Sequence, residues 1–535
     1  MPVRFALPLL LLAGAAQAQT AVSVAIDATA GQHPISPLIY GVAFGAKADL
    51  ATLNAPLNRS GGNRTSTYSW SASASNTAAD YYYESYPDPS ATPGSGPDSL
   101  IADSKAAGAA PMITIPLIGF VAKLGPNRAI LPSYSVAKYG AQCSVDPYDT
   151  DAGNGLKPDC TTRITGNVKT DAYVADNATR EQGWINHLIK KWGKAGAGGV
   201  PYYLMDNEPS IWFGTHPDIH PAGPHGTEYV KKVLAESAKI RAADPAAKIL
   251  APEEWGWEGY FYDGYDQQYA AAHGYSGFPD HAGTQKGLDY IPWLLQQWKP
   301  SHAVDVLSVH FYPQGNEFSD TVDTATQLLR NRSTRQLWDP NYVSESWIGA
   351  PVYLIPRLKA WVAANYIAGT PVAITEYNWG AEGSINGATT QADIYGIFGQ
   401  QGLDMATRWT TPANTTPTFK AMQMYRNYDG AKSSFGDTSV SAVAPNPDNL
   451  SAFAALRGTD HALTVMVINK VLPASPAVAT PLTLTLAHAT ASGTAQRFQL
   501  TAANTIQKLA PLAWSGGVLA DSLPAQSVTL YVLPQ

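Results

Sequence analysis

The sequence predicts a (β/α)8 barrel of the TIM type joined to an all-β sandwich. Between residues 37 and 432, short apolar runs alternate with amphipathic helical patterns, as in a closed parallel barrel. From residue 433 to 535 the helical pattern stops, and alternating runs such as Leu482–Leu486 follow one another between Ser, Thr, Pro and Gly turns. Val22–Ile26, within the segment 19–36, also alternates, and we expect it to add a strand to the sandwich.

Each predicted barrel strand is a short, β-prone apolar run. In chain order the eight runs are Ile39–Ala43, Pro56–Arg64, Pro111–Ile118, Gly199–Met205, Lys248–Glu254, Val304–Tyr312, Pro371–Gly380 and Leu403–Trp409. The helical patterns between them are Ser99–Ala107, Arg180–Trp192, Thr227–Ala243, Leu288–Trp298, Thr321–Asn331, Ile355–Ala364, Gln391–Gln401 and Phe419–Tyr428. The chemistry of such barrels gathers at the carboxyl ends of the strands, so we expect one functional face there.

Two glutamates stand where apolar runs end. Glu208 follows the run Val200–Met205, and Glu376 lies near the end of Pro371–Gly380. A carboxyl group at the end of a buried strand is rigid and partly desolvated, which suits a general acid. Glycoside hydrolysis needs two carboxyl groups that flank one bond. The pair therefore predicts a glycoside hydrolase, although Glu253 and Glu254 are equally eligible by chemistry alone and the residues do not assign the roles.

Other polar and aromatic side chains are expected on the same face. Asn207 is a candidate partner for a sugar 2-hydroxyl, and Tyr312 or His310 for a hydrogen bond to Glu376. Tryptophans just after strand ends are candidate platforms for sugar rings, whereas any single tryptophan can instead belong to the core. The predicted substrate-binding residues are Asn63, Asn207, Trp212, Glu254, Trp255, Trp257, His310, Tyr312, Trp379 and Trp409.

Six longer motifs carry a resemblance to a known family. They are Asn207–Trp212 (NEPSIW), Thr215–Pro221 (THPDIHP), Pro252–Trp257 (PEEWGW), Val309–Gly315 (VHFYPQG), Thr375–Glu382 (TEYNWGAE) and Asp404–Trp409 (DMATRW). Over residues 36–435 the sequence resembles glycoside hydrolase family 44, whose members are retaining endoglucanases and xyloglucanases. The resemblance implies a barrel plus a sandwich built from both chain ends, Glu208 as acid/base and Glu376 as nucleophile. It also moves Glu253 and Glu254 to supporting or binding roles. Ser60 departs from the family pattern, which has a bulkier residue there.

The beginning of the chain predicts export. Arg4 precedes the apolar run Phe5–Ala16, and the small-x-small site Ala16–Ala18 follows. This is a signal peptide over residues 1–18, so we expect a secreted protein, extracellular or periplasmic, cleaved near Ala18. We see no later apolar stretch long enough to cross a membrane. The formal net charge of -7 and the lack of a basic stripe exclude nucleic acid as a partner. We expect a monomer.

The two cysteines, Cys143 and Cys160, are expected to pair, closing a loop worth roughly 3 kcal/mol. Within and beside that loop, oxygen-bearing side chains recur at Asp146, Asp149, Asp151, Asn154 and Asp159. Such spacing is typical of calcium loops, but Gly153 and Cys160 depart from that pattern. We expect a solvated polar loop, with a structural Ca²⁺ as the alternative. The predicted chemistry requires no metal or cofactor.

The predicted function is internal cleavage of a β-1,4-glucan by double displacement. Xyloglucan, carboxymethylcellulose and mixed-linkage glucan are candidate substrates, and the residues do not rank them. A xylanase or mannanase on the same barrel is one alternative. A carbohydrate-binding protein without catalysis and a structural surface protein are two others, against which the presence of both glutamates and Asn207 argues. The sandwich is expected to buttress the barrel, because it shows no evident cluster of exposed aromatic residues.

Overall fold

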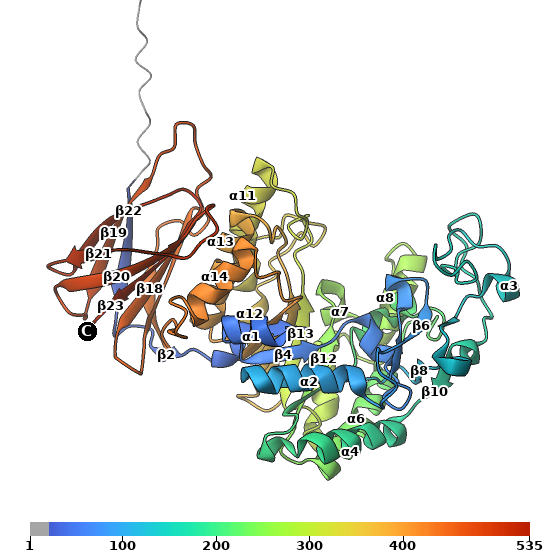
Figure 1. Ribbon diagram of the computed structural model, residues 1–535. Coiled ribbons are helices and arrows are strands. Elements are labelled where there is room, and N and C mark those ends of the chain that lie inside the picture. Colours follow the sequence, from blue (N-terminus) through green and yellow to red (C-terminus); the bar gives the residue numbers. More distant parts are fainter. Residues whose placement is uncertain (1–20) are drawn as a thin grey trace, which may run out of the picture.

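The computed structural model describes residues 21–535 and shows a barrel domain and a β-sandwich (Figure 1). The predicted fold class is confirmed. The predicted signal peptide, residues 1–18, lies outside the described residues. Within residues 21–535, no helix has both the length and the apolar composition of a membrane span.

The barrel consists of eight parallel strands that overlap the eight predicted runs. It closes in the order β11-β12-β13-β14-β15-β3-β4-β7. The strands are β3 (Gly41–Ala43), β4 (Leu57–Ser60), β7 (Ala110–Ile115), β11 (Tyr202–Met205), β12 (Lys248–Glu254), β13 (Val306–Phe311), β14 (Val372–Tyr377) and β15 (Met405–Arg408). One side chain from each of seven strands fills the interior: Leu57, Met112, Leu204, Leu250, Val306, Ala373 and Met405. These strands are buried on both faces, which is why they read as continuous apolar runs.

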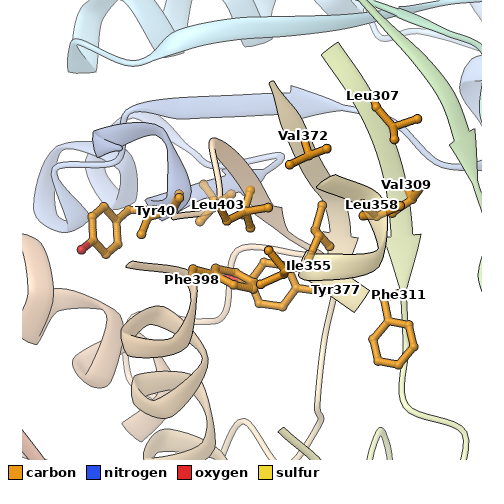
Figure 2. Packing of buried hydrophobic residues seen from close by; sticks show 14 of the residues in the cluster. Tyr40, Leu307, Val309, Phe311, Ile355, Leu358, Val372, Tyr377, Phe398 and Leu403 are labelled. Carbon is orange, nitrogen blue, oxygen red and sulfur yellow. The ribbon is translucent and has the colours of Figure 1, made fainter. Parts of the chain in front are cut away.

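Helices cover the outside of the barrel. They are α1 (Lys47–Leu53), α2 (Ser95–Ala107), α4 (Ala178–Trp192), α6 (Gly226–Ala243), α10 (Tyr290–Trp298), α11 (Thr324–Ser333), α12 (Leu354–Asn365), α13 (Ile385–Gln400) and α14 (Pro417–Arg426). Shorter helices α3 (Val136–Tyr139), α5 (Trp212–Thr215), α7 (Trp257–Phe261), α8 (Gly264–Ala272) and α9 (Pro279–Ala282) lie in the loops. The sequence reading missed α1. Figure 2 shows the packing of the outer strand faces, where Leu307 and Val309 of β13 and Val372 of β14 lie near Ile355 and Leu358 of α12.

The sandwich takes strands from both ends of the chain. They are β1 (Val22–Asp27), β2 (His33–Pro34), β16 (Thr438–Val443), β17 (Leu450–Leu456), β18 (Leu463–Asn469), β19 (Thr480–Ala487), β20 (Gly493–Leu500), β21 (Gln507–Trp514), β22 (Val518–Leu523) and β23 (Ser527–Leu533). The blue strand β1 lies among the red strands in Figure 1, antiparallel to β16 and parallel to β19. It buries Val24 and Ile26 in the sandwich core. The predicted N-terminal contribution is therefore present.

The two domains share a packed interface along α13. The ring of Phe453, from β17, lies where a Cβ at Gly396 would be, 2.1 Å away, so only glycine permits this contact. Beside it Lys470 Nζ lies 2.6 Å from Asp393 Oδ2, and both side chains are 2% exposed. A buried ion pair and a close ring-to-backbone contact fix the sandwich against the barrel, as the expected buttress requires.

Two small sheets lie outside the barrel. The first contains β5 (Ala74–Asn76) and β6 (Glu84–Pro87), from the segment between β4 and β7, and is joined by β9 (Leu131–Pro132) from the long excursion that follows β7. The second contains β8 (Phe120–Ala122) and β10 (Tyr173–Ala175), both from that excursion. The predicted disulfide between Cys143 and Cys160 is present. The sequence analysis treated most of this region as irregular, because strands of two to four residues carry too little pattern to be recognised.

The five oxygen-bearing residues of the suspected calcium loop do not converge on one point. Asp159 accepts hydrogen bonds from the backbone of Thr161 and Thr162, and Asp151 accepts from Ser135 and the Ala137 amide. Short Asp side chains bind nearby backbone N–H groups readily, so each closes its own turn. This arrangement fits the expected polar loop and does not support the alternative of a calcium loop built from these five residues. Asp146 differs from the others, because it is fully buried.

Candidate active site

A cavity of about 1270 Å³ opens at the carboxyl ends of the barrel strands. It is lined by residues from β4, β11, β13, β14 and β15 or from the loops that follow them. Six predicted site residues line it: Asn63, Asn207, Glu208, Tyr312, Glu376 and Trp409. These side chains are far apart in the sequence, and the barrel places them together at the carboxyl ends of its strands, as predicted.

Glu208 lies just beyond β11 on a strained backbone. Its φ of 46° and ψ of 56° are in the left-handed region, and its amide donates to the Glu253 carbonyl at 3.0 Å. The side chain is 15% exposed, and its Oε1 lies 2.8 Å from His310 Nδ1. Burial raises the pKa of Glu208, and the hydrogen bond and charge of His310 only partly offset that effect. Glu208 is therefore suited to carry a proton near neutral pH.

Glu376, at the end of β14, is held by two donors. Arg59 Nη1 donates to Oε1 at 2.6 Å, and the Tyr312 hydroxyl donates to Oε2 at 2.8 Å. The Glu376 side chain is 6% exposed, and Arg59 is fully buried. Both partners only donate to this group, so they hold it as an anionic carboxylate.

The two carboxyl groups are close together. One oxygen of Glu208, one of Glu376 and a ring nitrogen of His310 all lie within 4.8 Å of one another. Retaining glycosidases place their carboxyl groups about 5–5.5 Å apart, whereas inverting enzymes need about 6.5–9.5 Å to admit a water molecule. The oxygen-to-oxygen distance of this pair is nearer to the retaining range than to the inverting range.

Behind the pair lies a third carboxylate that the sequence reading did not place. Glu253 Oε2 is 3.2 Å from Arg59 Nη2 and 3.2 Å from His310 Nε2, and all three side chains are fully buried. Burial alone would raise the pKa of Glu253, but the His310 hydrogen bond and the Arg59 charge outweigh it and hold that pKa below its usual value. Burial would likewise lower the pKa of His310, yet the Glu376 charge and the hydrogen bonds of Glu208 and Glu253 raise it to about 9.

The directions of these shifts favour a protonated Glu208, a cationic His310 and an ionised Glu253 near neutral pH, and Arg59 adds a second buried cation. The predicted contact between His310 and substrate is wrong, because the ring is fully buried and does not line the cavity. Strand parity explains this placement. His310 alternates with Val309 and Phe311, which face outward, so its ring points into the barrel beneath Glu208.

Asn207 is fixed with its oxygen occupied. Its Oδ1 accepts from the Gly62 amide at 3.0 Å, and its Nδ2 lies 3.4 Å from Asn63 Oδ1. The preceding Asp206 accepts from Ser66 Oγ at 2.5 Å and from the amides of Leu117 and Ile118. Asp206 therefore ties together the loops after β4, β7 and β11, and Asn207 presents an N–H donor at the cavity wall.

Four of the predicted tryptophan platforms are not in the cavity. Trp212 is fully buried, with its indole N–H on the Asn207 carbonyl, and Trp379 is 3% exposed, with its indole N–H on Ser333 Oγ. Trp255 and Trp257 are half-buried and do not line the cavity either. These four predictions are wrong because loop geometry turns each indole toward the protein.

Glu254 also departs from its predicted binding role. It is fully buried and accepts from Ser210 Oγ at 2.5 Å, and burial raises its pKa to about 8. It is thus a neutral buried acid rather than a substrate contact.

Two exposed aromatic residues that the sequence reading missed line the cavity. Phe44 is 47% exposed and meets Trp409 edge-on at 5.6 Å between ring centroids. Phe318 is 51% exposed and meets Tyr312 edge-on at 5.4 Å. Phe44 has φ of 53°, an unusual conformation for a bulky residue, and such strain is concentrated at functional sites. With half-buried Trp409, these rings form part of the aromatic surface of the cavity, which Tyr68, Tyr86, Trp184 and Tyr312 also line.

Comparison with known proteins places the chain in a family. The sequence model of glycoside hydrolase family 44 matches residues 74–315. The solved structure of CelM2, a bifunctional glucanase-xylanase from a metagenome library, is 56% identical, with a TM-score of 0.94 over 96% of this chain and 99% of that one. The chain belongs to glycoside hydrolase family 44. The resemblance seen in the motifs is confirmed.

Two more distant relatives support the same assignment. The structure of a family 44 xyloglucanase from Paenibacillus polymyxa is 26% identical, with a TM-score of 0.77 over 96% of this chain and 99% of that one. Endoglucanase A of Paenibacillus lautus is 31% identical over 84% of this chain. The chain spans 64% of the length of that endoglucanase.

Proposed function

We propose that this family 44 protein is a retaining, endo-acting β-1,4-glucanase. The observation that carries the proposal is the carboxyl pair Glu208 and Glu376, within 4.8 Å of each other in an open, aromatic-lined cavity. One member is held as an anion and the other is disposed to keep its proton. Those are the two states that the first step of double displacement requires.

In the first step, a carboxylate oxygen of Glu376 attacks the anomeric carbon while Glu208 gives its proton to the departing glycosidic oxygen. The bond to the leaving sugar breaks as the ester bond to Glu376 forms. In the second step, Glu208, now ionised, removes a proton from water, which attacks the anomeric carbon and releases Glu376. The Asn207 N–H group is placed to bind the sugar 2-hydroxyl, a contact that strengthens in the transition state.

The proposed substrates are β-glucans such as xyloglucan, carboxymethylcellulose and mixed-linkage glucan. Xylan is the favoured second substrate, because the 56% identical CelM2 is a glucanase-xylanase. A mannanase on the same carboxyl pair remains a distinct alternative, and it differs in the pocket around the sugar ring rather than in the chemistry.

The test measures viscosity and reducing ends on xyloglucan, unsubstituted β-glucan, xylan and glucomannan. The variants are Glu376→Gln and Glu208→Gln, with Glu254→Gln as the matched control, because a neutral buried acid is well replaced by an amide. We expect the first two variants to lose at least about 100-fold in kcat on polymeric glucan, and the control to stay within about threefold. Wild-type protein that releases nothing from either β-glucan would refute the glucanase proposal. A loss in Glu254→Gln equal to the others would refute the assignment of the pair.

We propose that the chain is exported and acts as a monomer. The apolar run Phe5–Ala16 and the site ending at Ala18 support export. N-terminal sequencing of the protein from its native host tests cleavage near Ala18, and an intact start at Met1 in purified protein would contradict it. Light scattering of the purified protein tests the monomer, which a doubled mass would contradict.

We also propose a structural calcium site at Glu84 and Asp146, which catalysis does not use. Both side chains are fully buried, and the two carboxyl groups lie within hydrogen-bonding reach of each other, with Tyr86 also at Glu84 and Tyr81 at Asp146. Burial and the neighbouring Asp146 raise the pKa of Glu84 to about 7, so at higher pH two adjacent carboxylates carry like charges that a bound cation would offset. We expect a chelator at about pH 8 to lower the melting temperature, with Ca²⁺ restoring it. No shift at that pH would contradict the site.

A further inference from the structure

A second cavity of about 840 Å³ lies beside the catalytic one. It is formed by the loops after β13 and β14 and by the start of α14. Its lining is Phe318, Asp320, Val322, Asn378, Gly380, Ala381, Glu382, Gly383, Ser384 and Thr416. Phe318 is the one residue that lines both cavities, so its ring stands on the boundary between them.

The exposure of Phe318 is built into the fold. The fully buried Arg330 donates to the carbonyls on both sides of it, to Glu317 at 2.7 Å and to Ser319 at 2.6 Å. The same guanidinium donates to the Trp379 carbonyl at 3.1 Å, which joins the loop after β13 to the loop after β14. An apolar ring that is half exposed on an anchored backbone is a preformed contact surface rather than a frayed loop tip.

The contact between the loops after β13 and β14 is also fixed. A Cβ at Gly380 would lie 2.3 Å from the Phe318 carbonyl oxygen, and Gly380 has φ of 70°, so only glycine allows the loops to touch here. Farther along, Arg408 Nη2 holds Glu382 Oε1 at 2.7 Å. The Glu382 side chain stays 31% exposed and lines the cavity, as Ser384 does. A rigid aromatic ring in the same cavity as fixed polar acceptors is the chemistry that recognises a sugar ring.

We propose that the second cavity binds pyranose rings of the polysaccharide that lie beyond those in the catalytic cavity, with Phe318 as the platform that carries the chain between the two. This inference rests on the proposed glucanase function and adds a remote binding region to it. The rings can come from the backbone of the glucan or from a xylosyl branch. Binding energy gained there is remote from the cleaved bond, so it lowers the barrier only for substrates long or branched enough to reach it.

The test measures kcat/KM on linear β-1,4-gluco-oligosaccharides of increasing length and on xyloglucan oligosaccharides with the same backbone lengths. The proteins are wild type, Phe318→Ala, Phe318→Tyr as the conservative variant, and Tyr148→Ala as a control for the loss of an exposed aromatic residue. Tyr148 is 92% exposed and lies outside both cavities. Melting temperatures of all four proteins verify that each is folded.

For wild type we expect kcat/KM to increase once the substrate exceeds a threshold length. We expect this gain to be about tenfold smaller in Phe318→Ala. Because Phe318 also lines the catalytic cavity, short substrates that fill only that cavity give the reference activity of each protein, and the loss in Phe318→Ala should be larger on long substrates than on short ones. Phe318→Tyr should restore the gain. A gain in kcat/KM on linear substrates shows that the second cavity binds rings of the glucan backbone. A gain confined to branched substrates shows that it binds the xylosyl branch. If wild type cleaves these substrates with no gain, or if Phe318→Ala keeps the gain, the inference is overturned. If wild type cleaves none, the glucanase proposal itself fails.

Discussion

Replacing Arg59 by methionine tests the electrostatic design of the site, because the change keeps most of the apolar volume and removes the cation. Arg59 lies 2.6 Å from Glu376 and 3.2 Å from Glu253, and the three side chains are 0%, 6% and 0% exposed. Without it, two buried carboxylates share His310 as their remaining cation. Removing one partner of a buried ion pair costs about 3–5 kcal/mol, so we expect the free energy of unfolding to fall by about 4 kcal/mol at neutral pH.

The same loss should depend on pH. The pKa of Glu253 is held below its usual value of 4.5 in the folded protein. Its contribution to stability is therefore complete above 4.5 and disappears as the pH falls through the folded value. The difference between wild type and Arg59→Met should accordingly shrink in acid.

Urea unfolding followed by tryptophan fluorescence at about pH 7 and about pH 3.5 measures both quantities. Arg330→Met is the matched control. This second buried arginine donates to the carbonyls of Glu317, Ser319 and Trp379, and its charge only partly offsets the effect of burial on the pKa of the Glu317 carboxyl. Its cost should therefore change less with pH than that of Arg59→Met. Equal losses for Arg59→Met at the two pH values would refute the argument.

Three further predictions follow from named contacts. The value of kcat/KM should fall as the pH rises through the raised pKa of Glu208, and His310→Gln should move this alkaline limb of the profile to higher pH, because the imidazolium partly lowers the pKa of Glu208. An alkaline limb that stays in place or moves to lower pH contradicts this. Trp409→Ala should raise KM about tenfold with little change in stability, whereas Trp379→Ala, which empties a core position, should lower the free energy of unfolding by about 3–5 kcal/mol. Steady-state kinetics and urea unfolding of both variants test this, and the reverse pattern would exchange the two roles. Replacing Cys143 and Cys160 together by serine should cost about 3 kcal/mol while leaving kcat unchanged, and a lower kcat in a folded variant would connect the loop to the site.

The barrel strands were predictable from sequence because their physics is local. A parallel strand covered on both faces must be apolar along its length, and Leu307 and Val309 illustrate this, packing outward while Val306 faces inward. The positions of Glu208 and Glu376 follow from the same rule, since each ends such a run. The sequence does not predict which way a side chain points where the conformation of a loop determines it. Trp379 follows its strand directly, yet its indole turns to Ser333, and Phe44 shows no pattern beyond a single apolar residue.

Arg59 shows a different limit. A charged residue inside a predicted strand signals a buried partner, because an unpaired charge in a barrel is too costly. The sequence does not reveal which partners these are, since Glu253 and Glu376 lie 194 and 317 positions away. Their identity depends on how the barrel closes, which is a property of the whole chain.

The position of β1 determines when the sandwich can be completed. This strand forms its ladders with β16 and β19, whose residues come more than 400 positions later in the chain. During synthesis the apolar side of Val24 and Ile26 therefore has no native partner until almost the entire barrel has been made. The barrel is, topologically, an insertion between the first and second strands of one ladder. Completion of the sandwich consequently draws the two ends of the barrel together, and the first strand gains its second neighbour only when β19 has been made.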